Sequence, residues 1–196
     1  MRRGWLALAL ALAGCTPRGA KGDAGARGAG DGAPAAGDGS PPDSNPDGAR
    51  EPGPAIDALP PSPSDDLTTR ARHLLEAIAK DDPGLAADIV FPRDAYVAAK
   101  DAADPGKQWD DKVLAAFQRS VHALHKRTPN VERAQFSDFE VGVPISQVVP
   151  KKHDMKVALW RVRHGRLGFT IEGKESRFDV GEMMSWKGAW YVLSLR

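Results

Sequence analysis

A long segment that is poor in large apolar side chains limits how much of this chain is able to fold. In residues 16–65, glycine, alanine and proline supply ten residues each, and Ile56 and Leu59 are the only large apolar side chains. The same segment carries 4 basic and 8 acidic side chains. Such a composition buries too little apolar surface to offset the entropy that ordering would cost. We therefore predict a disordered tether over residues 15–65 and one folded domain over residues 66–196.

The N-terminus has the layout of a secretory signal. Arg2 and Arg3 precede an unbroken apolar run at residues 5–13, which ends in small residues. The run is far shorter than the roughly 20 residues of a transmembrane helix. Residues 12–15, Leu-Ala-Gly-Cys, resemble the lipobox of bacterial lipoproteins.

The lipobox resemblance implies that residues 1–14 are a signal peptide and that Cys15 carries the lipid. Two or three acyl chains at one cysteine anchor a protein stably in a membrane. Thr16 is not the aspartate that commonly retains such proteins in the inner membrane, so the resemblance implies an outer-membrane protein that faces the periplasm. Because Cys15 is the only cysteine, we expect the domain to fold without an intramolecular disulfide.

The charge balance gives no sign of a nucleic-acid partner. The formal net charge of the whole chain is +1, and the folded part intersperses 21 basic with 18 acidic side chains. A domain that binds nucleic acid usually gathers basic residues into a patch or stripe. We therefore expect no nucleic-acid partner.

Three stretches after the tether have the apolar spacing of amphipathic helices. Ser64 or Asp65 is expected to cap the first helix, which ends near residue 80. The second is predicted over residues 83–90, with a proline at its first position and another proline after its end. The third and longest is predicted over residues 109–126.

After residue 130 the apolar period changes from that of a helix to that of a strand. Alternating apolar residues predict strands near residues 139–143, 158–163, 167–171, 178–184 and 189–195. His164-Gly165 and Lys187-Gly188 are expected to be turns. Helices followed by hairpin-linked strands indicate an α+β fold with an antiparallel sheet.

This order of elements resembles the NTF2-like, or cystatin-like, superfamily over about residues 66–196. Residues 186–193, WKGAWYVL, are similar to the final hairpin of many such domains. The resemblance implies about three N-terminal helices packed on a bent antiparallel sheet of four to six strands, with a conical interior. It also implies a homodimer, formed through the open face of the sheet. The superfamily includes ketosteroid isomerase and scytalone dehydratase as well as binding and assembly modules, so the fold does not give the function.

Polar and aromatic side chains that would approach the interior of such a cone form a candidate pocket. They are Asp94, Tyr96, Trp109, Glu140, Trp160, Glu182 and Trp190, with Arg161 as a further polar candidate. A buried acid beside a tyrosine would suit proton transfer, because burial shifts pKa values. The aromatic residues would suit an apolar or sugar-like ligand. The same residue types also occur in the core and on the solvated faces of ordinary sheets.

Motifs for metal binding and catalysis are weak. His122 and His125 lie three positions apart in the third predicted helix, a spacing at which two histidines can share a metal ion. Metal sites need three or four ligands, however. The folded part contains no glycine-rich phosphate loop, and we expect neither a metal nor a cofactor. We interpret the protein as a lipid-anchored envelope protein whose domain binds a protein partner or a small ligand. The alternatives are an isomerase or dehydratase that acts on an apolar substrate, and a structural subunit of an envelope assembly.

Overall fold

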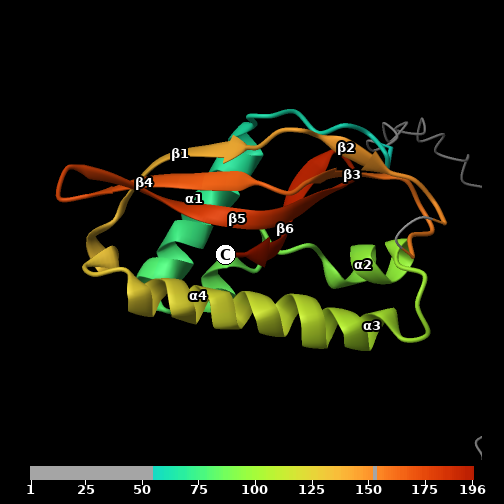
Figure 1. Cartoon of the computed structure of the whole chain (residues 1–196), viewed down its shortest axis with the longest axis horizontal. Helices are drawn as coiled ribbons and strands as arrows, with labels where there is room; N and C mark the ends of the chain where they lie inside the picture. The colour runs from blue at the N-terminus through green and yellow to red at the C-terminus, as the bar shows by residue number, and fades with distance from the viewer. Residues whose placement is uncertain (1–54, 152–153) are drawn as a thin grey trace, which may run out of the picture. The chain divides into compact units, whose positions relative to one another are not determined.

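The domain combines helices with one curled antiparallel sheet. The computed structural model describes residues 55–151 and 154–196, so the predicted signal peptide, Cys15 and most of the tether lie outside the described residues. In Figure 1 the sheet bends around the helices, with α1 behind it and α4 below it. The prediction of an α+β fold with a bent antiparallel sheet is confirmed. No helix in the described ranges is both long and apolar enough to cross a membrane.

Helix α1, Asp65–Lys80, begins where the sequence predicts it. The Ser64 hydroxyl accepts a hydrogen bond from the Leu67 N–H (3.1 Å) and so satisfies one of the free donors of the first turn. One face of the helix is buried. Its buried side chains are Leu67, Arg70, Ala71, Leu74, Leu75, Ala77 and Ile78.

The helix predicted over residues 83–90 is wrong. A single 3₁₀ turn, η1 (Pro83–Ala86), forms there, and Val90 instead makes a parallel β-bridge with Val192. The Phe91 N–H donates to the Val192 carbonyl (2.9 Å), so the sheet takes the backbone groups that a helix would use. Helix α2, Arg93–Ala99, begins only after this bridge, and the sequence reading missed it.

The long predicted helix is confirmed, with an earlier start. Three segments follow one another without a break: α3 (Pro105–Gln108), the π-helical η2 (Trp109–Leu114) and α4 (Ala115–Arg127). The spacing predicts Val113, Leu114, Phe117, Val121 and Leu124 on the buried face; all are buried except Leu114, which is half-buried. A short 3₁₀ turn, η3 (Val131–Arg133), leads from α4 into the sheet.

Within the described residues, six strands form one sheet. They are β1 (Gln135–Val141), β2 (Ser146–Val148), β3 (Leu159–Val162), β4 (Gly165–Ile171), β5 (Lys174–Trp186) and β6 (Ala189–Leu195). The order is β1-β4-β5-β3-β2, and β6 pairs with β5. Strand β2 was not predicted.

The turn predicted at His164-Gly165 is wrong, because β3 and β4 pair with β5 in one continuous register. Val162 of β3 pairs with Met183, and Gly165 of β4 pairs with Val180. Both pairs are separated by three residues on each chain segment, so β4 continues the line of β3 along β5. The chain reverses later, at Glu172 and Gly173, where both φ angles are positive. A Cβ atom on Gly165 would lie 3.2 Å from the side chains of Val180 and Met183, so this glycine allows close packing rather than a turn.

Two clusters of buried hydrophobic residues hold the elements together. The larger cluster joins α1 and α4 to β1, β4, β5 and β6, and it includes Trp190, which is 1% exposed. The smaller cluster surrounds Phe91 between α2 and the strands β2, β3 and β5. Its buried members are Phe91, Ala95, Ala99, Val148, Met155, Leu159 and Met184.

The first described residues contact the sheet. The indole N–H of Trp160 donates to the Asp57 carbonyl (2.9 Å), and Pro60 is buried. Both contacts fall within the segment whose composition predicts a tether. The chain therefore meets the domain at β3 before it enters α1.

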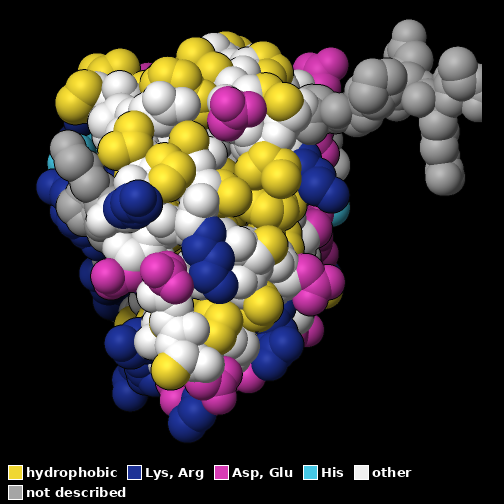
Figure 2. Space-filling view, turned by 90° about the vertical axis from the view of Figure 1, so that its right-hand side faces the viewer, with side chains coloured by type: hydrophobic (Ala, Val, Ile, Leu, Met, Phe, Trp, Pro, Cys, Tyr) yellow, Lys and Arg dark blue, Asp and Glu magenta, His cyan; other side chains and the backbone are white. Residues whose placement is uncertain are grey.

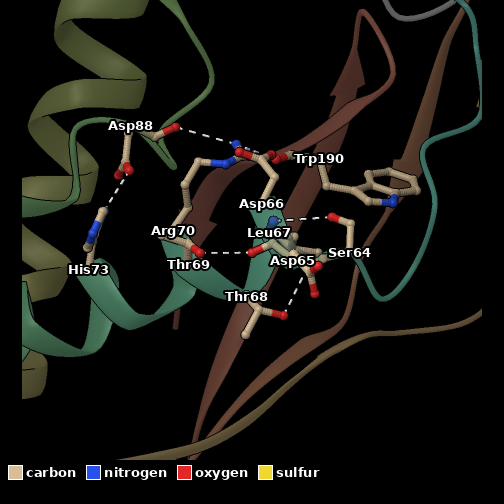
Figure 3. A network of polar contacts seen from close by, with 10 residues as sticks. All are labelled: Ser64, Asp65, Asp66, Leu67, Thr68, Thr69, Arg70, His73, Asp88 and Trp190. Atoms are coloured by element: carbon tan, nitrogen blue, oxygen red, sulfur yellow. Dashed lines mark hydrogen bonds and ion pairs between the residues drawn. The ribbon is translucent and has the colours of Figure 1, made fainter.

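Arg70 joins α1 to the start of β6, at Trp190 (Figure 3). Its side chain is buried, and Nη1 donates to the carbonyl of Trp190 (2.9 Å). Nη2 pairs with Asp66 on the same helix, and the guanidinium lies 4.7 Å from the ring centre of Tyr191. A single cation thus holds the helix, the strand backbone and an aromatic ring together.

Candidate functional site

A pocket lies between α2, η2 and the sheet, and we call it the α2 pocket. Its volume is about 330 Å³. Its lining is Phe91, Tyr96, Ala99, Lys100, Lys112, Val113, Val148, Met155, Arg161, Glu182, Met184, Leu193 and Ser194. Two larger hollows of about 520 Å³ each involve β1 and β4, but most of the side chains that line them are exposed. The α2 pocket is the one with a mainly buried apolar wall.

The pocket lies towards the end of the domain that carries α2, β2 and β3. That end is on the right in Figure 1 and faces the viewer in Figure 2. Hydrophobic side chains lie close together on this face, and basic and acidic side chains stand among them (Figure 2).

Phe91 is the centre of the apolar wall. It is 1% exposed, and its ring meets those of Tyr96, Trp186 and Tyr191 edge to face at 6.1–6.5 Å between centroids. The β-bridge beside it fixes its backbone, and Trp109 Nε1 donates to its carbonyl (2.7 Å). The wall opposite includes Met155 and Met184, whose flexible thioether side chains adapt to the shape of a guest.

Tyr96 lines the pocket from the middle of α2. Burial raises the pKa of this phenol, because an ionised phenolate would lose hydration. At neutral pH the group is therefore a neutral hydrogen-bond donor and acceptor.

Arg161 and Glu182 form the central charged pair of the pocket. Arg161 stands on β3 and Glu182 on β5, and their closest N–O distance is 3.7 Å, between Nη1 and Oε1. The Arg161 side chain is 16% exposed, and that of Glu182 is 37% exposed. The register between β5 and β6 shifts just before and just after Glu182. These shifts interrupt the regular alternation of side chains between the two faces of β5.

The guanidinium of Arg161 uses none of its N–H donors in a hydrogen bond to another described residue. The distance to Glu182 exceeds that of a hydrogen bond, and Nε is buried without a partner. Arginine has five such donors and stays charged at any physiological pH. The Arg161 side chain is 16% exposed, and its terminal N–H groups are the donors that an acceptor in the pocket could use.

Two lysines add further positive charge to the lining. Lys100 follows α2 and pairs with Asp154 at 3.7 Å, while Lys112 lies on η2. With Arg161 they make three cations against one carboxylate, Glu182, among the lining residues. Lys112 is exposed, so the less exposed part of this positive charge belongs to Lys100 and Arg161.

The structure brings three of the candidate residues together in this pocket, namely Tyr96, Arg161 and Glu182. Asp94 is exposed on α2, outside the lining. Glu140 is exposed on β1 and lies 3.7 Å from Arg166.

None of the three predicted tryptophans lines the α2 pocket. Trp109 supports it from behind through Phe91. Trp160 contacts Asp57, and Trp190 is buried in the larger hydrophobic cluster. The space of the pocket is therefore not filled by these side chains.

Sequence reasoning missed the lysines and the methionine of the lining. Lys100 and Lys112 look like ordinary solvated residues beside helices, and Met155 lies in a loop without apolar periodicity.

The two histidines on α4 do not form part of a metal site. His122 Nδ1 lies 2.8 Å from Asp81 Oδ2, whereas His125 Nδ1 lies 2.9 Å from the carbonyl of Ile78. In the described part of the chain, no group of three or more His, Cys, Asp or Glu residues is arranged to hold a metal ion.

No protein-family model, curated protein or solved structure matches this chain. The site must therefore be interpreted from its own geometry.

Proposed function

We propose that this protein is a lipid-anchored envelope protein whose domain binds a small, largely apolar molecule in the α2 pocket. The observation that carries this proposal is an apolar-walled space of about 330 Å³ that the large aromatic residues leave open. Small-molecule pockets in proteins span roughly 300–1,000 Å³ and combine apolar walls with a few polar groups. A small ligand is thus a better match to this pocket than a protein partner.

The order of helices and the curled sheet support an NTF2-like domain as part of the proposal. In that arrangement the space between the helices and the sheet is where a guest would lie. The low-complexity segment before the domain supports a tether, and a flexible coil of its 50 residues would reach about 40 Å. The domain would then capture its ligand well above the membrane surface.

We expect Cys15→Ser to release the protein from the membrane. Serine provides no thiol for the lipid, and the described helices offer no membrane-spanning segment as a substitute. Labelling with a clickable palmitate analogue, followed by membrane fractionation, measures both effects. Incorporation of the label into the Cys15→Ser variant would show that the lipobox assignment is wrong.

We expect Leu193→Trp to abolish binding of a neutral apolar probe. Leu193 is partly buried and lines the pocket, so the added ring volume would occupy the space of the guest. A suitable probe is N-phenyl-1-naphthylamine, whose fluorescence rises on entering an apolar site. Titration of the full-length chain with the probe should show saturable binding that falls at least tenfold in the variant.

Leu193→Met is the matched control, because it conserves volume and apolar character. It should bind the probe as the wild type does. Equal probe binding by the Leu193→Trp variant would place the probe elsewhere and contradict the proposal. Attention would then move to protein partners and to exposed apolar side chains such as Val143, which is 79% exposed.

An enzyme of isomerase or dehydratase type is a second candidate, because two polar groups capable of proton transfer line the same pocket. The neutral phenol of Tyr96 would donate a proton, and the carboxylate of Glu182 would accept one. Chemical conversion of a bound molecule would favour this candidate. Its return from the protein unchanged would favour binding alone.

A further inference from the structure

We propose that the α2 pocket selects an amphipathic carboxylate, whose carboxylate group pairs with Arg161 while its apolar body packs on the Phe91 wall. This proposal rests on the proposed binding function and adds the chemical class of the ligand.

The charge of the lining favours an anion over a neutral or cationic guest. Lys100, Lys112 and Arg161 face one carboxylate, that of Glu182. Asp154 pairs with Lys100 from outside the lining, and its side chain is 77% exposed. Water screens Asp154 and the exposed Lys112 alike, so the excess of positive charge inside the pocket comes from Lys100 and Arg161 against Glu182.

Arg161 is the residue best placed to hold the anion. Its side chain is largely buried, and its only ionic partner among the described residues, Glu182, lies 3.7 Å away. At that distance Glu182 orients the guanidinium by its charge but accepts no hydrogen bond from it. The parallel N–H donors of a guanidinium match the two oxygens of a carboxylate, which a lysine ammonium does not do.

The remaining walls require that most of the ligand be apolar. Phe91, Val148, Met155 and Met184 are all buried, and they come from four separate segments of the chain. An inorganic anion would leave these surfaces without a partner, whereas an aromatic or aliphatic body would cover them. One anionic group on an apolar body is thus the chemistry that the whole lining fits.

A matched pair of probes tests the class of ligand without any substitution in the pocket. Naphthalene-1-acetate and naphthalene-1-acetamide share their shape and differ in charge. Each probe is titrated into the full-length chain carrying Cys15→Ser, and calorimetry measures the affinity. The substitution keeps lipid out of the assay. We expect the acid to bind about 10- to 100-fold more tightly than the amide, because only the acid forms an ion pair with Arg161.

Variants then assign the preference to Arg161. Arg161→Gln should remove the advantage of the acid and leave the amide within about twofold of its wild-type affinity. Arg163→Gln is the control, since it removes the same charge from an exposed position two residues away. Arg161→Lys should retain only part of the preference for the acid. The lysine ammonium keeps the positive charge but lacks the paired N–H donors of the guanidinium.

The outcomes separate the two proposals. Equal affinity for the acid and the amide, with both lost in Leu193→Trp, would overturn the carboxylate proposal and leave the binding function standing. A preference for the acid that survives Arg161→Gln would overturn the role of Arg161. Failure of both probes and of N-phenyl-1-naphthylamine to bind would overturn both proposals. The probe pair on the Cys15→Ser chain, whose pocket is unaltered, decides the class even if the Arg161 variants do not fold.

Discussion

Replacing Arg70 by methionine is expected to lower the free energy of unfolding by about 3 kcal/mol. Methionine fills most of the space but cannot donate to the carbonyl of Trp190, which receives a hydrogen bond from Arg70 at 2.9 Å. A buried carbonyl without a partner costs about 1–3 kcal/mol, and the contact with the Tyr191 ring is lost as well. The ion pair with Asp66 adds little, because that carboxylate is 68% exposed.

Thermal and urea unfolding measure the effect of Arg70→Met. We expect the midpoint temperature to fall by about 10 °C for a domain of this size. Arg119→Met, an exposed substitution on α4, is the control and should change stability by less than about 0.5 kcal/mol. A similar decrease in the free energy of unfolding in both variants would mean that the buried contacts of Arg70 do not stabilise the domain.

Gly142→Ala is expected to destabilise the domain by about 3 kcal/mol, at the upper end of what overpacking usually costs. A Cβ atom at this position would lie 1.5 Å from the carbonyl oxygen of His164. That oxygen belongs to the backbone between β3 and β4, so it cannot move aside as a flexible side chain would. The substitution must displace the end of β1, where Val141 pairs with Gly165.

Circular dichroism during urea unfolding is a direct measurement of the Gly142→Ala effect. Val143→Ala is the matched control at the adjacent exposed position, and it should leave stability unchanged within about 0.5 kcal/mol. Wild-type stability in Gly142→Ala would show that the two backbone segments separate more easily than their close approach suggests.

Local patterns predicted those elements whose structure depends mainly on their own residues. The apolar spacing of α1 and α4 and the cap at Ser64 were sufficient, because each helix buries one continuous stripe. Residues 83–90 have a good helix start, yet Val90 pairs with Val192, a residue about a hundred positions later. The residues around Val90 give no sign of a partner so far along the chain. Pairing with Val192 therefore outweighed the local helix propensity of residues 83–90.

The glycine at 165 shows a second limit of sequence reasoning. A glycine after a histidine is an ordinary turn signal, but here it permits close approach of β4 and β5. Turn and packing glycines look the same in a sequence and differ only in their surroundings. The continuous register of β3 and β4 on β5 therefore could not be predicted.

The candidate site was predictable only in part, for the same reason. Tyr96 and Glu182 were expected near an interior, and the fold brings both to one pocket. Trp160 and Trp190 have the same strand alternation as pocket residues, yet their neighbours place one against Asp57 and the other in the core. Which side of a strand faces a pocket depends on bulges such as those in β5, and the sequence does not mark them.

The length of β5 makes the two hydrophobic clusters one cooperative unit. Met183 belongs to the larger cluster and Met184 to the smaller one, so adjacent residues of a single 13-residue strand serve both. Separation of α2 from the sheet would disturb the same backbone ladder that holds Phe178 and Val180 against the helices. The domain should therefore open as one foldon rather than two. A guest in the α2 pocket would then slow amide hydrogen exchange as far away as β4, at the opposite end of the sheet.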